Sequence, residues 1–168
     1  MFVSVDGTDF QIPERGRQFF PFKFRKPVLT YKVGLSILGG EICWISGPYQ
    51  PGVHNDLQIF WTSLASHLDE IERVEADDGY IGEASPQIKC SACVTIPEER
   101  QDMMNRVQAQ QETINKQFKQ WQILKQVFHH DLSVHQDSSL LFLSYHSLPL
   151  NMVKLCSVFI MMMSSLAI

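Results

Sequence analysis

The sequence lacks the features that mark several large classes of protein. Its first residues, Met-Phe-Val-Ser-Val-Asp, carry neither the charged segment nor the apolar segment of a secretory signal. The four cysteines, at positions 43, 90, 93 and 156, form no regular framework, which argues against a disulfide-rich secreted domain and favours a reducing compartment. We therefore expect a protein that is not secreted.

An excess of positive charge is also absent. The 168 residues include 18 acidic and 14 basic side chains, for a formal net charge of -4, whereas a self-sufficient nucleic-acid-binding domain is usually basic. The most apolar stretch, residues 155–168, is shorter than the roughly 20 residues of a membrane-spanning helix. A short membrane anchor is the alternative for this stretch, but Lys154 and the polar pair at positions 164–165 argue against it. We expect no membrane segment.

The composition that remains is typical of one globular domain, with 45% hydrophobic and 19% charged residues. Alternating apolar and polar residues predict a short first strand over residues 2–6, which would end at the turn Gly7-Thr8. The same alternation over residues 28–38 and 41–46, on either side of Gly39-Gly40, predicts an antiparallel hairpin.

Helical periodicity appears in two places. Asn55 or Asp56 can cap a helix that runs to about His67, and acidic residues after Pro97 open a long helix with no proline or glycine over residues 98–133. Brief strands are expected between the helices, near residues 71–76 and 93–96. The order β-β-β-α-β-(β)-α predicts an α/β fold, in which a central mixed sheet combines an antiparallel hairpin with parallel strands and is flanked by helices.

Cations gather in one proline-rich connection early in the chain. Lysine and arginine neutralise DNA phosphates without reading sequence, so this segment is the best candidate for DNA contact, and a solvated loop is the alternative. The candidate residues are Arg15, Arg17, Lys23, Arg25 and Lys26.

Three acids stand out by their placement: Asp6, Asp77 and Glu112. Carboxylates that converge can hold two divalent cations for phosphodiester chemistry, but spacing alone does not distinguish this triple from others. Asp6 before Gly7 is also typical of a turn. On a helical wheel Glu112 points away from the apolar stripe, with Lys116 as its i+4 partner. It can face an acid cluster only if one flank of its helix packs on the core and another faces the cluster.

Several short motifs nevertheless occur together in a recognisable order. They are Val-Asp-Gly-Thr-Asp at 5–9, Tyr-Lys-Val-Gly-Leu-Ser-Ile at 31–37, Gly-Pro-Tyr-Gln-Pro-Gly at 47–52 with His-Asn-Asp at 54–56, Ala-Asp-Asp-Gly-Tyr at 76–80, and Glu-Thr-Ile-Asn at 112–115 with Phe-Lys at 118–119 and Leu-Lys at 124–125. Over residues 3–135 the chain resembles the DDE endonuclease domain of PIF/Harbinger-type (IS5-like) transposases.

The resemblance implies an RNase H-like fold and a DDE triad that binds Mg²⁺ or Mn²⁺ for DNA cleavage and strand transfer. Its motifs assign catalysis and metal binding to Asp6, Asp77 and Glu112. Asp78 occupies a variable position of the motif and is favoured as a solvated turn residue. Asp56 matches the family's His-Asp segment, and a capping role is favoured there over metal contact.

The chain also departs from the family. Members of the family carry a DNA-binding region before the first catalytic acid, but here only five residues precede Asp6. After Asp137 the sequence becomes apolar. We expect a catalytic domain over residues 1–137 and a divergent tail over 138–168. DNA is the expected partner, through a missing domain or a separate DNA-binding protein, and a second copy of the chain is a candidate. The expected compartment is the nucleus in a eukaryote and otherwise the cytoplasm. The alternative function is a catalytically silent transposase relic or a protein-interaction module.

Overall fold

A five-stranded sheet forms the centre of the molecule, with β1 in the middle of the strand order β3-β2-β1-β4-β5. The computed structural model describes residues 2–14, 16–21, 25–76, 87–90, 98–129 and 131–145. The strands are β1 (Phe2–Gln11), β2 (Val28–Ser36), β3 (Ile42–Tyr49), β4 (Arg73–Ala76) and β5 (Ile88–Cys90). The helices are α1 (Asp56–Ile59), α2 (Glu98–Phe118), α3 (Gln122–Lys125) and α4 (Leu132–Tyr145), with short helical turns η1 (Arg17–Phe19), η2 (Phe60–Leu64) and η3 (Ala65–His67).

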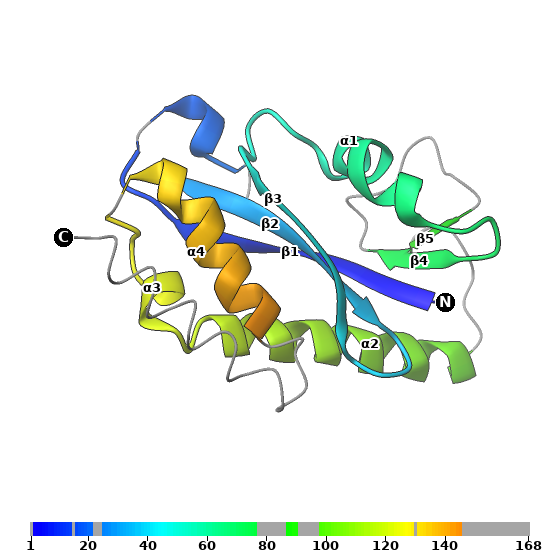
Figure 1. Cartoon of the computed structure of the whole chain (residues 1–168). Helices are drawn as coiled ribbons and strands as arrows, with labels where there is room; N and C mark the ends of the chain where they lie inside the picture. Colours follow the sequence, from blue (N-terminus) through cyan, green and yellow to red (C-terminus); the bar gives the residue numbers. More distant parts are fainter. Residues whose placement is uncertain are drawn as a thin grey trace.

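The sheet combines two kinds of pairing. β1, β2 and β3 form an antiparallel meander, whereas β4 pairs parallel with β1 and β5 pairs parallel with β4. Helices flank this sheet (Figure 1). The predicted α/β class, the mixed sheet and the hairpin at 28–46 are therefore confirmed, as is the helical segment that begins after Asn55 and ends at His67.

Two apolar clusters lie on opposite faces of the sheet, because successive side chains of a strand point to opposite sides. On one face, strand residues pack with residues of α2 and α3 in the Phe10 cluster: Phe10, Ile12, Phe19, Leu29, Tyr31, Val33, Leu35, Phe118, Leu124 and Phe128. On the other, strand residues pack with η2 in the Val74 cluster: Val3, Val5, Phe60, Leu64, Val74, Ala76 and Ile88.

The first strand does not end where the sequence predicts. β1 continues through Gly7-Thr8 to Gln11, so Asp6 lies inside the strand and not at its end. Gly7 pairs with Lys32, and a Cβ at Gly7 would lie 3.1 Å from Lys32 Nζ. Because glycine has no Cβ, the Lys32 side chain can lie close to the backbone of β1 at this position, which is a known role of glycine within a sheet.

The long helix is also shorter than predicted. α2 ends at Phe118, and the chain turns through residues 119–121 into α3 although it contains no proline or glycine there. Tertiary contacts explain the break, because the backbone N–H of Phe128 donates to the carbonyl of Gln11 at 2.9 Å and Leu124 and Phe128 both join the Phe10 cluster. A continuous helix would carry these residues away from the sheet.

The predicted boundary after Asp137 falls inside α4, which spans Leu132–Tyr145. Residues 138–145 thus continue a helix whose buried members include His135 and Ser139. Nothing in the part of the chain that the structure describes is a helix long and apolar enough to cross a membrane.

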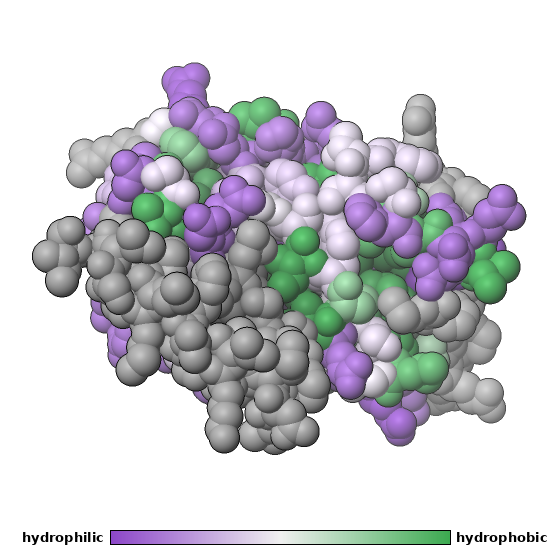
Figure 2. All heavy atoms as spheres, viewed as in Figure 1, coloured by the Kyte–Doolittle hydropathy of each residue, from purple (hydrophilic) through white to green (hydrophobic). Residues whose placement is uncertain are grey.

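β3 forms one edge of the sheet, and none of its residues is fully buried. In Figure 2, which has the viewpoint of Figure 1, hydrophobic side chains (green) gather near the middle of the view and also reach its edge in places, between hydrophilic ones (purple).

Candidate functional site: a cleft between β1, β4 and α2

A cleft of about 440 Å³ lies between the sheet and α2. Residues of β1 and β4 form the floor of the cleft, and residues of α2 form one wall. Of the residues that the structure describes, three acids line the cleft: Asp6 from β1, Glu75 from β4 and Glu112 from α2. The other lining residues are neutral: Ser4, Val5, Ala76, Gln101, Met104, Asn105, Val107, Gln108 and Gln111.

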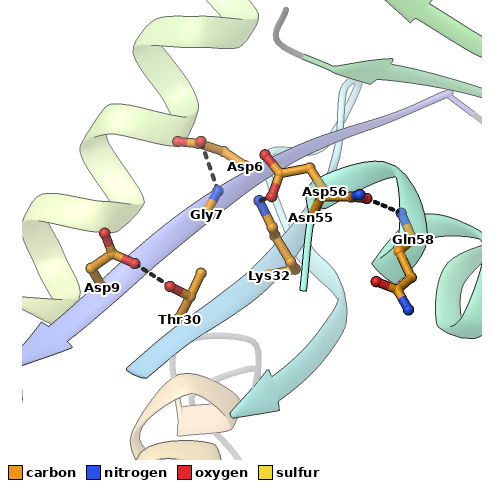
Figure 3. Close-up of polar contacts among 8 residues, drawn as sticks. All are labelled: Asp6, Gly7, Asp9, Thr30, Lys32, Asn55, Asp56 and Gln58. Carbon is orange, nitrogen blue, oxygen red and sulfur yellow. Dashed lines mark hydrogen bonds and ion pairs between the residues drawn. The ribbon is translucent and has the colours of Figure 1, made fainter. Parts of the chain in front are cut away.

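Asp6 is partly buried, and donors from β1 and α2 bind its carboxylate. The backbone N–H of Gly7 donates to Oδ1 at 2.7 Å, and Asn115 Nδ2 donates to Oδ2 at 3.0 Å. The carboxylate points from the strand toward α2 (Figure 3). These two bonds fix the orientation of the carboxylate.

Glu112 is exposed on the flank of α2 that borders the cleft. Its carboxylate lies 3.8 Å from Lys116 Nζ, with 59% of the Glu112 side chain and 78% of the Lys116 side chain exposed. The i+4 partner predicted from the helical wheel is therefore confirmed. The same helix buries Val107 and Phe118, so one flank of α2 packs on the core while another carries Glu112 into the cleft, as the sequence argument required.

The predicted second acid, Asp77, lies outside the described residues, as does Asp78. The described chain reaches Ala76, which pairs with Val5 and lines the cleft. Val5 directly precedes Asp6, and Ala76 directly precedes Asp77. Asp77 and Asp6 therefore each follow, in the sequence, one member of this pair of neighbouring strand residues. The role of Asp77 in the triad stays a prediction.

Three residues in or beside the cleft were given no role from the sequence: Glu75 and Gln111, which line it, and Asn115, which binds the cleft residue Asp6. Glu75 pairs with Ser4 in the parallel register and lines the cleft. Gln111 and Asn115 each bind β1 through their side-chain amides, Gln111 to Ser4 and Asn115 to Asp6. Gln111 follows the buried Val107 by four residues, so its helical position alone indicated that it faces the sheet. No sequence signal distinguished Glu75 from other strand acids.

Asp56 is neither the helix cap nor part of the cleft lining. Asn55 is the cap, since its Oδ1 accepts from the backbone N–H of Gln58 at 2.7 Å. Asp56, the first residue of α1, forms an ion pair with Lys32 at 2.6 Å, and the Lys32 side chain is only 5% exposed. Figure 3 shows this pair beside β1, together with the Asp9–Thr30 bond. Lys32, which lies in the basic stretch of the sequence, thus ties α1 to the sheet.

The predicted DNA-contact residues lie at another place. Arg17 belongs to η1, and Arg17, Arg25 and Lys26 are exposed, whereas Arg15 and Lys23 lie outside the described residues. η1 lies near the end of β1 that is farther from the N-terminus (Figure 1). The structure does not bring these cations into the lining of the acidic cleft.

The donor set of the cleft fits a hard divalent cation, which prefers carboxylate and carbonyl oxygens. Asp6, Glu75 and Glu112 supply carboxylates, and Gln111 supplies a buried amide oxygen, Oε1, that has no hydrogen-bond partner in the described structure. Among residues 2–76, 87–90 and 98–145, leaving out the positions not described, no group of three or more His, Cys, Asp and Glu side chains is close enough to hold a metal ion. A complete site would therefore need Asp77 or a movement of side chains within the cleft.

A second buried polar group lies away from the cleft, between β2 and α4. His135 is fully buried, and its Nδ1 lies 2.8 Å from Tyr31 Oη and 3.0 Å from Ser139 Oγ. Burial lowers the pKa of His135 to about 4 and raises the pKa of Tyr31 to about 12. The neutral forms of both side chains are therefore favoured. Their hydrogen bonds connect α4 to Tyr31, a member of the Phe10 cluster.

Comparison of the chain with protein-family models, curated proteins and solved structures gives no match.

Proposed function

We propose that this domain is a transposase-derived, divalent-metal-dependent endonuclease that acts on DNA phosphodiester bonds, built on an RNase H-like fold. The observation that carries the proposal is the meeting of Asp6 and Glu112 in one cleft, although they lie in different elements at opposite ends of the domain sequence. Ala76, directly before Asp77, lines the same cleft. The order of the sequence motifs supports the same assignment.

In this proposal the side chains have separate tasks. Asp6 and Glu112 are the described cation ligands, and Asp77 is the third. Gly7 N–H and Asn115 Nδ2 hold the Asp6 carboxylate toward α2. Two bound cations would polarise the scissile phosphate, activate a water and stabilise the leaving oxygen.

Thermal unfolding with Mn²⁺ or Mg²⁺ tests the cation site. At 100 times the dissociation constant, a bound cation stabilises the folded state by about 2.7 kcal/mol, which raises Tm by roughly 5–10 °C in a domain of this size. We expect that rise for the parent protein and its loss in Asp6→Asn, Asp77→Asn and Glu112→Gln. Asp102→Asn is the matched control, because Asp102 is exposed on α2 and does not line the cleft.

Nicking of supercoiled plasmid in Mn²⁺ tests the reaction itself, with the same four variants. A parent protein without a metal-dependent rise in Tm and without nicking would overturn the proposal. The silent relic or interaction module would then be the better explanation of the chain.

A further inference from the structure

Exposed cations lie at one end of the sheet, where β1 ends and β2 begins. They come from two segments that are far apart in the sequence: the connection between β1 and β2, residues 12–27, and α3 with the residues after it, 122–129. Figure 1 shows η1 and α3 at this end of the molecule. The cations described in these two segments are all exposed, and we call them together the cationic end: Arg17, Arg25, Lys26 and Lys125.

Backbone hydrogen bonds hold both segments to the end of β1. The N–H of Ile12, directly after the strand, donates to the carbonyl of Pro27 at 3.1 Å. The carbonyl of Gln11 accepts from the N–H of Phe128 at 2.9 Å. Lys26 directly precedes Pro27, so its backbone lies beside the strand end to which the segment after α3 is also bound.

The Phe10 cluster anchors the backbone that carries two of these cations. Phe19 of η1 and Leu124 of α3 are buried members of that cluster. Arg17 precedes Phe19 by two residues, and Lys125 directly follows Leu124. The charges therefore project from backbone that is already ordered, so a partner that binds them pays little for ordering the chain.

The charge of the cationic end is not neutralised by its surroundings. None of its four side chains forms a hydrogen bond or an ion pair with another residue that the structure describes, whereas Lys32 and Lys116 are paired with acids. In the described parts of the two segments Glu14 is the one acid, and Asp131 follows at the start of α4. Unpaired, exposed cations attract a polyanion from solution.

Acidic residues predominate at the opposite end of the sheet. Asp69 and Glu70 are exposed in the turn before β4, and β4 begins beside the start of β1, since Arg73 pairs with Phe2. Asp102 is exposed in the first half of α2, which begins at the same end (Figure 1). The net charge of -4 therefore conceals a separation of charge, and this separation orients a polyanion toward the cationic end.

We propose that the cationic end binds the phosphate backbone of double-stranded DNA that reaches the cleft. Lysine and arginine bind phosphates without reading bases. The inference rests on the proposed function for the choice of DNA as the polyanion and for its path to the cleft. Asp6 and Gln11 are five residues apart in β1, which is about 17 Å. At about 3.4 Å per base pair, the contacted phosphates lie about five base pairs from the cleft.

Fluorescence anisotropy of a short labelled DNA duplex with the full chain in EDTA tests this surface without any metal. The logarithm of the binding constant should fall linearly with the logarithm of the salt concentration. We expect Arg17→Gln, Lys26→Gln and Lys125→Gln each to make this slope shallower by about 1, and the triple variant by about 3. Because these side chains are exposed, the variants should keep the Tm of the parent within about 2 °C.

Arg106→Gln is the matched control, because it removes one exposed positive charge from α2 toward the acidic end. Its salt slope should equal that of the parent. Equal slopes for the triple variant and the parent, or the same loss in Arg106→Gln as in Lys125→Gln, would overturn the inference. A parent protein that binds no duplex, or that binds phosphatidylserine vesicles more tightly than the duplex, would overturn it as well.

This test and that of the proposed function fail in different ways. A parent that binds the duplex through the cationic end in EDTA, but shows no rise in Tm with Mn²⁺ and no nicking, would keep the phosphate-binding surface and lose the nuclease. A parent that nicks plasmid, with a triple variant that binds the duplex as the parent does, would keep the nuclease and lose this surface.

Discussion

On the face of the sheet that packs against α2, the two halves of β1 differ in polarity: the first half is polar and the second half is apolar. Toward α2, the first half offers Ser4 and Asp6, and the second half offers Phe10, with Thr8 between them and Ile12 directly after the strand. The polar half is joined to α2 by side-chain amides, whereas the apolar half is sealed by aromatic and aliphatic side chains. One strand thus carries a candidate site at one end and a core at the other.

This difference indicates how the fold tolerates a polar cleft next to its centre. Each neutral hydrogen bond contributes only about 1 kcal/mol net, so the amides of Gln111 and Asn115 specify position more than they supply stability. Burial of a large apolar side chain contributes about 1.5–3 kcal/mol, and the Phe10 cluster contains ten such residues. On the face toward α2, apolar burial is concentrated at one end of the strand, which leaves the other end of that face free to hold carboxylates.

The largest expected effect follows from breaking the apolar end. Phe118 is fully buried in the Phe10 cluster, so Phe118→Ala should lower the free energy of unfolding by about 3–5 kcal/mol, measured by urea denaturation. Met103→Ala on the same helix is the control, because Met103 is 46% exposed, and should cost below about 1 kcal/mol. Similar costs for the two variants would contradict the assignment of stability to the apolar end.

The next effect is a pH dependence that also belongs to the apolar end. His135 has a pKa of about 4 in the folded protein and about 6.5 when unfolded, so the unfolded chain binds more protons between these values. The free energy of unfolding should therefore fall as the pH is lowered from 6.5 to 4, by roughly 3 kcal/mol in total from this residue.

Urea denaturation of the parent and of His135→Phe across that pH range measures this contribution. Phenylalanine fits the aromatic surroundings of Phe10 and Phe128 but cannot titrate, so the variant should have a shallower pH dependence. Parallel curves for the two proteins would show that His135 does not titrate with folding.

Much of the fold follows from local patterns in the sequence. The hairpin of β2 and β3 and the helical segment after Asn55 were predicted correctly, because alternation and capping are short-range signals. The end of β1 and the end of α2 were wrong for a shared reason. The strand continues through Gly7, which pairs with Lys32 of β2, and the chain leaves α2 where it makes contacts with β1. In both cases the partner lies far away in the sequence.

The candidate site was predictable to a lesser degree. Pattern alone left Asp6 as a turn residue and Glu112 as a solvated one, and only the family resemblance joined them. Their shared cleft depends on the packing of α2 against β1, which periodicity does not determine in detail. Gln111 and Glu75 were missed because their importance arises from partners on other elements, Ser4 above all.

A smaller effect of opposite sign is expected at the border between the two halves. Thr8 is 2% exposed, and its Oγ1 has no hydrogen-bond partner in the described structure. Thr8→Val should raise the free energy of unfolding by about 1 kcal/mol, because it removes a buried hydroxyl that gains no bond. Thr30→Val is the matched control: its hydroxyl donates to Asp9 at 2.6 Å, so the same change should lower stability. Destabilisation by both variants would mean that Thr8 belongs to the polar half.

The smallest effect is expected for the ion pair at the polar end. Because both side chains are mostly exposed and 3.8 Å apart, Lys116→Gln should change the free energy of unfolding by less than about 0.5 kcal/mol. Added salt should reduce the effect further, since it screens exposed charges. Lys119→Gln, at an exposed position three residues on, controls for the loss of a positive charge. A loss above about 1 kcal/mol specific to Lys116 would mean that this pair stabilises α2 by more than an exposed i,i+4 ion pair does.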